Sequence, residues 1–234
     1  MRIVVTEYPK SGGSWLTNLI ADAIGFPKRD IYVNNGYNLF EITKHPWYEN
    51  SSELGLTESC VIKSHELPNS PLIDFDASYI HLIRDGRDVV VSRYFYERDF
   101  CVQNGIYESF DIPFEEYVEK TASEWLAFVM AWEQENVYTA KYEDLLADAY
   151  TILISIFDYL KIPVTHEKIA KSVNDNSFDK MRKALDKTFR YNTFCRKGVA
   201  GDWRHHFTEG NKRTFKRVAG DTLIKLGYET DYDW

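Results

Sequence analysis

Four short apolar runs along the chain predict buried strands. They cover residues 3–6, 60–62, 79–83 and 137–140, and none contains a charged side chain. Short runs of this kind, each followed by a polar segment, are typical of strands that are covered on both faces. We therefore expect four strands, separated by longer segments of a different period.

The segments between these strands carry apolar residues at helical spacing. After the first strand the apolar positions are Trp15, Leu16, Leu19, Ile20, Ala23 and Ile24. Gly25 and Pro27 end this pattern, and Asp88 can cap a helix after the third strand. Further helices are predicted at residues 111–134, 146–160, 165–172, 177–186 and 211–226. Residues 28–57 show no clear period and are predicted as loops with short helical turns, and residues 188–213 are polar and basic with little period.

Strands that alternate with helices predict an α/β fold. The length of 234 residues suits one domain over residues 1–234, with a central parallel sheet flanked by helices. In such sheets ligands bind beyond the carboxyl ends of the strands. The polar segments that follow the predicted strands are therefore the first places to look for a site.

The composition of the chain restricts the kinds of partner that it is expected to bind. The net charge of −8 disfavours general binding to nucleic acid or to an anionic membrane, although a small anion responds to the local field. Cys60, Cys101 and Cys195 lie far apart, and no metal-ligand spacing occurs, so we expect neither a disulfide framework nor a metal. No apolar run reaches the ~18 residues of a membrane span, and we expect a cytoplasmic protein.

A glycine-bearing loop follows the first predicted strand and precedes the first helix. Residues 8–15 read YPKSGGSW, and glycines before a helix N-terminus allow close approach of a phosphate. The loop is neither a Walker A motif, whose Lys follows the second Gly, nor a Rossmann GxGxxG. Taken alone, it fits a phosphate-binding loop and an ordinary turn about equally well.

Four segments, in order, resemble the binding motifs of sulfotransferases that use 3′-phosphoadenosine 5′-phosphosulfate (PAPS). Residues 8–15 resemble the family's 5′-phosphosulfate loop YPKSGTTW, and residues 80–94 (IHLIRDGRDVVVSRY) resemble its 3′-phosphate segment. Residues 141–145 (KYEDL) resemble its YEDL element, and residues 196–203 (RKGVAGDW) resemble its RKGxxGDW signature. The resemblance implies a P-loop-like fold of the cytosolic sulfotransferase type, with PAPS as donor and 3′-phosphoadenosine 5′-phosphate (PAP) as product.

The resemblance also implies roles for individual residues of the donor site. Lys10 would hold the sulfate-bearing phosphate, and further donors would come from Ser11, Gly12, Gly13 and Ser14. The adenine would lie against aromatic rings, namely Trp15, Tyr142 and Phe178. Ser177 precedes that last ring in a segment similar to the family's TSF. The 3′-phosphate would be bound by Arg84, Ser92, Arg196, Lys197 and Gly198.

A catalytic base is implied by the segment after the second predicted strand. Lys63-Ser64-His65 resembles the family's K[ST]H element, in which the His is the base, so we assign His65 to that role and add Lys63 and Ser92 to the catalytic candidates. Glu66 is inserted before the Leu-Pro that usually follows, and this departure affects the geometry expected at the base. Tyr94, Phe95, Tyr96 and Phe100 are candidates for an acceptor pocket.

These residue types suit sulfuryl transfer, which resembles phosphoryl transfer in outline. A cation such as Lys10 can stabilise charge on the leaving phosphate oxygen, and a His can take the proton of the acceptor. Two alternatives stay open at this stage: a P-loop-type nucleotide kinase and a PAP-binding module without catalysis. The acceptor is expected to be a small molecule with a hydroxyl or an amine, and its identity and the oligomeric state are not readable from the sequence.

Overall fold

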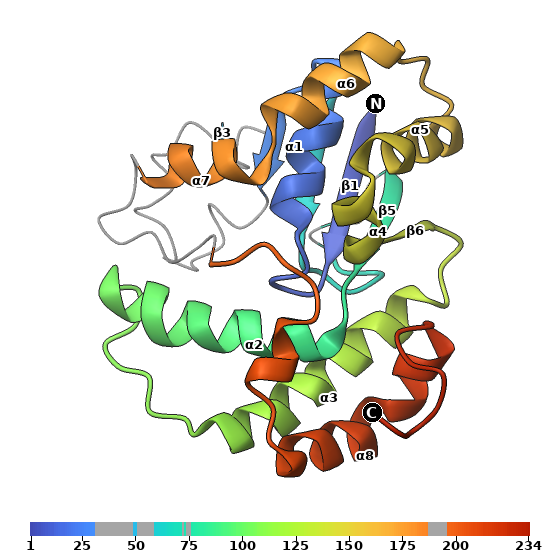
Figure 1. The fold of residues 1–234 in the computed structure, drawn as a ribbon. Helices are drawn as coiled ribbons and strands as arrows, with labels where there is room; N and C mark the ends of the chain where they lie inside the picture. Colours follow the sequence, from blue (N-terminus) through green and yellow to red (C-terminus); the bar gives the residue numbers. More distant parts are fainter. Residues whose placement is uncertain (31–48, 51–58, 72, 74–75, 187–195) are drawn as a thin grey trace.

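Six strands form a central sheet in the part of the chain that the computed structural model describes, namely residues 1–30, 49–50, 59–71, 73, 76–186 and 196–234. Their order is β3-β2-β4-β1-β5-β6, and every neighbouring pair is parallel. The strands are β1 (Arg2–Glu7), β2 (Lys28–Asp30), β3 (Glu49–Asn50), β4 (Cys60–Ser64), β5 (Ser78–Ile83) and β6 (Tyr138–Lys141). The predicted α/β fold with a central parallel sheet is confirmed (Figure 1).

The four predicted strands correspond to β1, β4, β5 and β6, whereas β2 and β3 were missed. Both lie within residues 28–57, where loops were predicted, and that prediction is wrong at these two places. The two strands are short and polar, and β2 is held by pairing, with Lys28 opposite Val61 of β4. Residues 31–48 and 51–58 lie outside the described residues.

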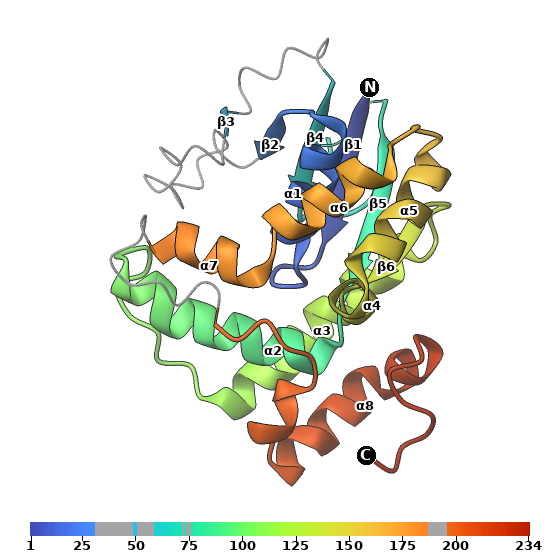
Figure 2. The same ribbon diagram turned by 45° about the horizontal axis from the view of Figure 1, so that its top comes forward.

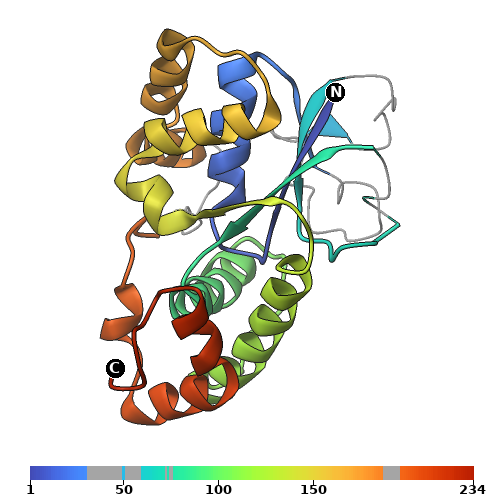
Figure 3. The same cartoon turned by 90° about the vertical axis from the view of Figure 1, so that its right-hand side faces the viewer.

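Alternate side chains of β1 enter two separate hydrophobic clusters, as the two-residue period of a strand requires. Ile3 and Val5 pack with residues of α1 (Gly13–Ile24), α5 (Ala149–Leu160) and α6 (His166–Asp175). Val4 packs with residues of α2 (Gly86–Phe95), α3 (Phe114–Trp132) and α8 (Glu209–Lys225). Figures 1 and 3 show the two helix groups apart, with α1, α5 and α6 towards the top and α2, α3 and α8 towards the bottom.

The remaining helices agree with the predicted periodicity except at their ends. The helix predicted over residues 146–160 is two helices, α4 (Tyr142–Ala147) and α5, because the Asp148 side chain accepts a hydrogen bond from the Thr151 N–H and caps the second one. α7 (Phe178–Asp186) lies at its predicted place. A π-helical segment, η3 (Tyr96–Cys101), continues α2. A 3₁₀ turn, η4 (Asp202–His205), lies within residues 188–213, where no element was predicted before residue 211.

Asp88 does not cap α2, contrary to the prediction. The cap is Asp85, whose carboxylate accepts a hydrogen bond from the Arg87 N–H at 2.9 Å. Asp88 is buried one turn further on and accepts hydrogen bonds from the Gly201 N–H at 2.6 Å and the Trp203 N–H at 2.9 Å. It therefore ties the C-terminal segment to α2, a role that depends on residues more than 100 positions away.

The segments that follow β1, β4, β5 and β6 meet at the carboxyl edge of the sheet. Figure 2 shows α2 and α7 flanking the loop that follows β1. Among the described helices, none has the length and apolar character needed to cross a membrane.

Candidate active site

A cavity of about 900 Å³ opens at the carboxyl edge of the sheet. It brings together side chains from segments that lie far apart in the sequence, after four different strands. Of the residues assigned to the site from the sequence, those that line it are Lys10, Gly12, Gly13, Ser14, Trp15, Lys63, His65, Arg84, Ser92, Tyr142, Ser177, Phe178, Arg196, Lys197 and Gly198.

Ser11 is the assigned residue that does not line the cavity. Its side chain is buried, and its Oγ has no hydrogen-bond partner among the described residues. A role for this hydroxyl as a donor to a ligand stays a prediction.

The loop between β1 and α1 adopts backbone conformations that favour glycine. Gly12 has a φ of 105° and is the residue before the first turn of α1. A Cβ at this position would also lie 2.7 Å from the Tyr142 ring, so a larger residue would be both strained and obstructed. Lys10 has a φ of 75°, which is unusual for a residue with a side chain and is found most often at functional sites.

The ammonium group of Lys10 lies 4.1 Å from the centre of the Tyr96 ring, a cation–π distance. Tyr96 in turn stacks on Phe100, with 5.2 Å between ring centres. Of the four aromatic residues proposed for an acceptor pocket, Tyr96 lines the cavity, whereas Tyr94, Phe95 and Phe100 are not among its lining residues.

His65 lies just beyond the end of β4, and its Nδ1 is 2.9 Å from the backbone carbonyl oxygen of Glu7. A carbonyl can only accept, so Nδ1 carries the proton and the lone pair of the neutral ring is on Nε2. Burial, reinforced by the positive charge of Lys63, lowers the pKa of His65 to about 3. The ring is therefore neutral at physiological pH.

Lys63 is the last but one residue of β4 and faces the first loop from the neighbouring strand. Its ammonium group donates to the Ser14 hydroxyl at 3.4 Å. The pair joins the end of β4 to the first turn of α1, so Lys63 adds a second positive charge to the cavity that Lys10 also lines.

Glu7 is a site residue that the sequence analysis missed. It is the last residue of β1, it is 3% exposed, and its carboxylate accepts a hydrogen bond from the Gly13 N–H at the start of α1. Burial raises the pKa of this carboxyl, while the charges of Lys63, Lys10 and Arg84 act in the opposite direction. The available signal was an acidic residue that ends an otherwise apolar strand directly before the loop.

Arg84 follows β5 and connects the first loop to the C-terminal segment. Its guanidinium donates to the Lys10 carbonyl oxygen and to the Val199 carbonyl oxygen, both at 3.1 Å. It also lies over the Tyr142 ring, 4.5 Å from the ring centre. Its buried Nε has no hydrogen-bond partner among the described residues.

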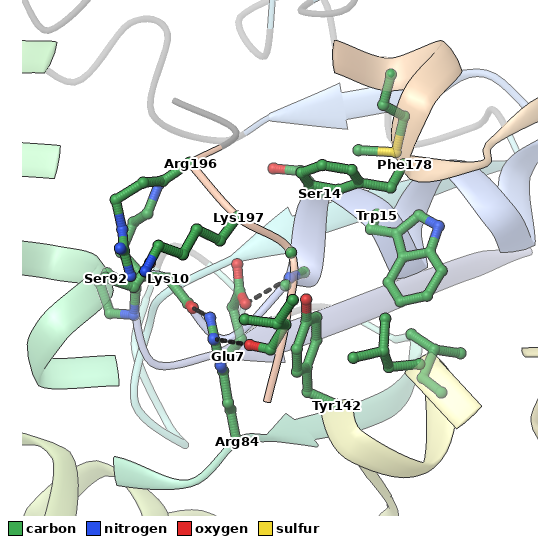
Figure 4. A pocket seen from close by; sticks show the side chains of 18 of the residues that line it. Glu7, Lys10, Ser14, Trp15, Arg84, Ser92, Tyr142, Phe178, Arg196 and Lys197 are labelled. Carbon is green, nitrogen blue, oxygen red and sulfur yellow. Dashed lines mark hydrogen bonds between the residues drawn. The ribbon is translucent and has the colours of Figure 1, made fainter. Parts of the chain in front are cut away.

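Arg196 and Lys197 reach the cavity from the C-terminal segment and share one carboxylate. Lys197 donates to Asp202 at 2.7 Å, Arg196 donates to the same side chain, and His206 lies 3.2 Å from it. Burial alone would raise the pKa of Asp202, but hydrogen bonds from Lys197 and Arg196 lower it to about 2. Figure 4 shows Arg196, Lys197, Ser92 and Lys10 gathered at one end of the cavity.

The other end of the cavity is aromatic. Trp15 and Tyr142 meet edge to face, with ring centres 6.1 Å apart, and the Trp15 indole donates to the Asn176 carbonyl oxygen at 2.9 Å. Phe178 lies against Gly198, where a Cβ would overlap the ring. Figure 4 shows Trp15 and Phe178 opposite the cationic end. The cavity thus offers flat rings at one end and positive charge at the other.

Arg93 and Glu97 also line the cavity and were not assigned to the site from the sequence. Arg93 donates to Glu97 at 2.7 Å, and it also bonds the Tyr8 hydroxyl and Glu124 of α3. Clustered charges on a helix are most often exposed to solvent. The partial burial of Arg93 between α2, α3 and the first loop could not be inferred from the local pattern of charge. Across the described part of the chain, no three His, Cys, Asp or Glu side chains come together in a group that could hold a metal.

Comparisons with known proteins agree with this geometry. The family model of the sulfotransferase domain matches residues 1–227. Sulfotransferase 2A6 of Mus musculus is 26% identical over 246 residues, covering 95% of this chain and 84% of the relative. Sulfotransferase 2A1 of Homo sapiens is also 26% identical, covering 97% of this chain and 86% of the relative.

Solved structures share the fold. Mouse sulfotransferase SULT7A1, complexed with PAP, has a TM-score of 0.73 at 24% identity and covers 97% of this chain and 86% of its own. Retinol dehydratase, in a complex with retinol and PAP, has a TM-score of 0.68 at 19% identity and covers 95% of this chain and 81% of its own.

Proposed function

The chain belongs to the sulfotransferase domain family, and we propose that it transfers the sulfuryl group of PAPS to a hydroxyl or an amine of a small-molecule acceptor. One observation carries the proposal. A single cavity is lined by Lys10, His65, a set of cations and an aromatic pocket, which are the parts that such a reaction needs. We further propose that the domain spans residues 1–234 and acts in the cytoplasm, where the buried thiols of Cys60 and Cys101 would stay reduced.

The residues present fit a nucleotide with two phosphates. Trp15, Tyr142 and Phe178 would hold the adenine. The guanidinium groups of Arg84 and Arg196 line the same cavity and suit the 3′-phosphate, together with Ser92 and Lys197. Arginine favours such a role because its planar fork matches phosphate oxygens. The amides at the start of α1, with Ser14, would bind the 5′-phosphosulfate.

Lys10 is proposed to stabilise the leaving phosphate oxygen. Its ammonium group lies over the Tyr96 ring, and this cation–π contact holds the positive charge in place. Lys63, bonded to Ser14, supplies a second charge beside the same loop. Fixed cations that face developing negative charge lower the barrier without reorganisation during the reaction.

His65 is proposed to accept the proton of the acceptor. The Glu7 carbonyl oxygen holds the Nδ1–H tautomer, which directs the basic lone pair to Nε2. The low pKa keeps the ring neutral and ready to accept, and the negative donor would raise that pKa once bound. The segment after β4, which contains His65, is fixed by the hydrogen bond from the Trp132 indole to the Glu66 carbonyl oxygen at 3.0 Å. Glu66 therefore extends the loop without releasing it.

We predict that His65 stays neutral down to about pH 5 in the donor-free protein, because burial and Lys63 lower its pKa to about 3. Nitrogen-15 NMR of the ring should show the Nδ1–H tautomer throughout that range. A His65→Asn variant identifies the signal by its loss. A midpoint near ~6.5, the value of an exposed His, would contradict the buried ring and its carbonyl partner.

The experiment that tests the function is calorimetric titration with PAP, ATP and AMP in buffer without metal. Micromolar binding of PAP with much weaker binding of ATP and AMP is expected, because the cations gathered around Arg196 suit a 3′-phosphate. Equal affinities, or no binding of PAP, would overturn the proposed donor site. Screening of phenols, alcohols and amines with PAPS would then identify the acceptor class.

We predict that Ser92→Ala weakens PAP binding about tenfold to a hundredfold, as expected for loss of a hydrogen bond to a charged group worth ~1.5–3 kcal/mol. Ser92 lies on α2 beside the cationic end of the cavity (Figure 4). The affinity for AMP, which lacks the 3′-phosphate, should stay unchanged in the same titration. A parallel loss for AMP would mean that Ser92 supports the fold or the adenine instead.

Of the two alternatives, the kinase is set aside by membership in the sulfotransferase family. The PAP-binding module without catalysis is not favoured, since Lys10 and His65 line the same cavity. Loss of kcat with retained PAP binding in variants of Lys10 and His65 would distinguish an enzyme from this module.

A further inference from the structure

Glu7 places a buried negative charge inside a site proposed to bind a polyanion. Its carboxylate lines the cavity, is 3% exposed and accepts the hydrogen bond of the Gly13 N–H. That amide is one of the donors at the start of α1 that the proposed function assigns to the 5′-phosphosulfate. A carboxylate and a donor oxygen cannot both accept from the same N–H with full strength.

The neighbourhood of Glu7 explains how the charge is tolerated without a ligand. The charged and titratable groups around it are Lys10 of the first loop, Lys63 and His65 at the end of β4, and Arg84 after β5. His65 is neutral, so three cations face one carboxylate. Buried charges are stable only when they are paired, and Glu7 provides a partner of opposite charge for these cations.

The packing around Glu7 leaves the carboxyl little room. A Cβ at Gly13 would overlap the Glu7 carboxyl group, so the side chain is pressed against the backbone of the loop. His65 Nδ1 bonds the carbonyl oxygen of the same residue, which fixes the main chain. The carboxyl therefore has two ways to admit a donor: it gives up the Gly13 amide, or it gains a proton.

We propose that Glu7 is an internal anion of the donor site, which occupies the Gly13 amide until the donor displaces it, with uptake of one proton by the carboxyl. The inference rests on the proposed function, because it takes the donor to be PAPS. The balance is simple: the carboxylate and one solvent proton become a carboxylic acid, and no covalent bond to the donor changes.

The pKa of Glu7 is raised, which is the direction that proton uptake on donor binding requires. Burial already favours the neutral form, and the negative charge of a bound donor would favour it further. A proton taken up on binding makes affinity fall as pH rises above the pKa of the free carboxyl. Donor affinity should therefore decrease as the pH rises from the pKa of the free carboxyl towards that of the donor-bound carboxyl, as far as Glu7 controls it.

The test compares wild type with Glu7→Gln in calorimetric titrations with PAP at pH 7.5. Each titration is run in two buffers of different ionisation enthalpy, without phosphate or sulfate. The amide oxygen of Gln can still accept from the Gly13 N–H, so the variant removes the charge and keeps the contact. Wild type should take up about one proton more than the variant, and the variant should bind PAP about tenfold more tightly. Protons taken up by PAP itself cancel in the difference.

Glu143→Gln is the matched control. Glu143 is also a largely buried carboxyl with a raised pKa, and it accepts a backbone hydrogen bond from the Asp85 N–H at 3.0 Å, but it does not line the cavity. Its variant should match wild type in proton uptake and in PAP affinity. Thermal unfolding of all three proteins checks that each is folded at the titration temperature.

Equal proton uptake in wild type and Glu7→Gln, or weaker PAP binding by the variant, would overturn this inference. If PAP binds none of the three folded proteins, the proposed function itself fails, so the two failures are distinguishable. As a second readout, the Gly13 amide signal should move with pH in free wild type and stay constant in Glu7→Gln. An amide that ignores pH in both would also refute the role of Glu7.

Discussion

Lys10→Met is expected to lower kcat for sulfuryl transfer about 10²–10³-fold, the usual loss when one fixed charge-stabilising group is removed from an active site. Met keeps much of the length and the apolar stem of Lys while removing the ammonium group that lies over Tyr96. The measurement is steady-state kcat with PAPS and the best acceptor from the screen. PAP affinity should fall much less, because Ser92, Arg84 and Arg196 remain in the cavity.

Two further variants make this result specific. Lys10→Arg keeps the charge at the same backbone position, and we expect it to recover part of the rate. Lys120→Met removes a lysine from the exposed face of α3 and should leave kcat unchanged. A Lys10→Met enzyme with normal kcat would remove Lys10 from the mechanism. Loss of PAP binding in proportion to kcat would reduce its role to donor binding.

Local sequence was sufficient wherever the required residues are contiguous. Each of the strands β1, β4, β5 and β6 is marked by its own apolar run, and the loop before α1 carries its glycines within eight residues. The position of these loops at one edge follows from the parallel sheet alone. The common placement of the segments that carry Lys10, His65, Arg84 and Tyr142 could therefore be predicted, whereas the roles of these residues came from the resemblance to sulfotransferases.

Residues whose environment depends on distant partners could not be predicted in this way. Asp88 looks like a helix cap by position, yet it bonds Gly201 and Trp203 from the C-terminal segment. Arg93 looks like a solvated charge, yet Tyr8, Glu97 and Glu124 surround it. Strand β2 has no apolar signal, because its pairing with β4 defines it.

The carboxylates around the cavity share one physical reason for their positions. The cavity contains many cations, and in the donor-free protein they have carboxylate neighbours: Glu7 near Lys63, Asp202 with Arg196 and Lys197, and Glu97 with Arg93. The motifs were read for the cations, which are proposed to contact the donor, and no role was assigned to the carboxylates, although Asp202 lies within one of the motifs. The compensating carboxylates follow from the cost of leaving buried charge unpaired. An acidic protein can therefore hold a strongly anionic ligand, because the balance of charge is local.

His65→Asn and His65→Gln are expected to lower kcat about 10²–10⁴-fold, the contribution of a positioned general base. Each variant is designed to keep one of the two contacts that the nitrogen atoms of the ring can make. The Asn amide can keep the hydrogen bond to the Glu7 carbonyl oxygen, and the longer Gln amide reaches towards the place of Nε2. Neither amide accepts a proton, so both variants should lose the rate whichever contact they keep.

The donor site should be unaffected by both changes, since His65 is not among the groups proposed to contact the nucleotide. PAP affinity within about threefold of wild type, measured in the same titrations, is therefore expected alongside the loss of kcat. His205→Asn, at an exposed position in η4, is the matched control and should behave as wild type. If only Gln lost activity, the contact to Glu7 would matter more than basicity. Full activity in both variants would show that another group takes the proton.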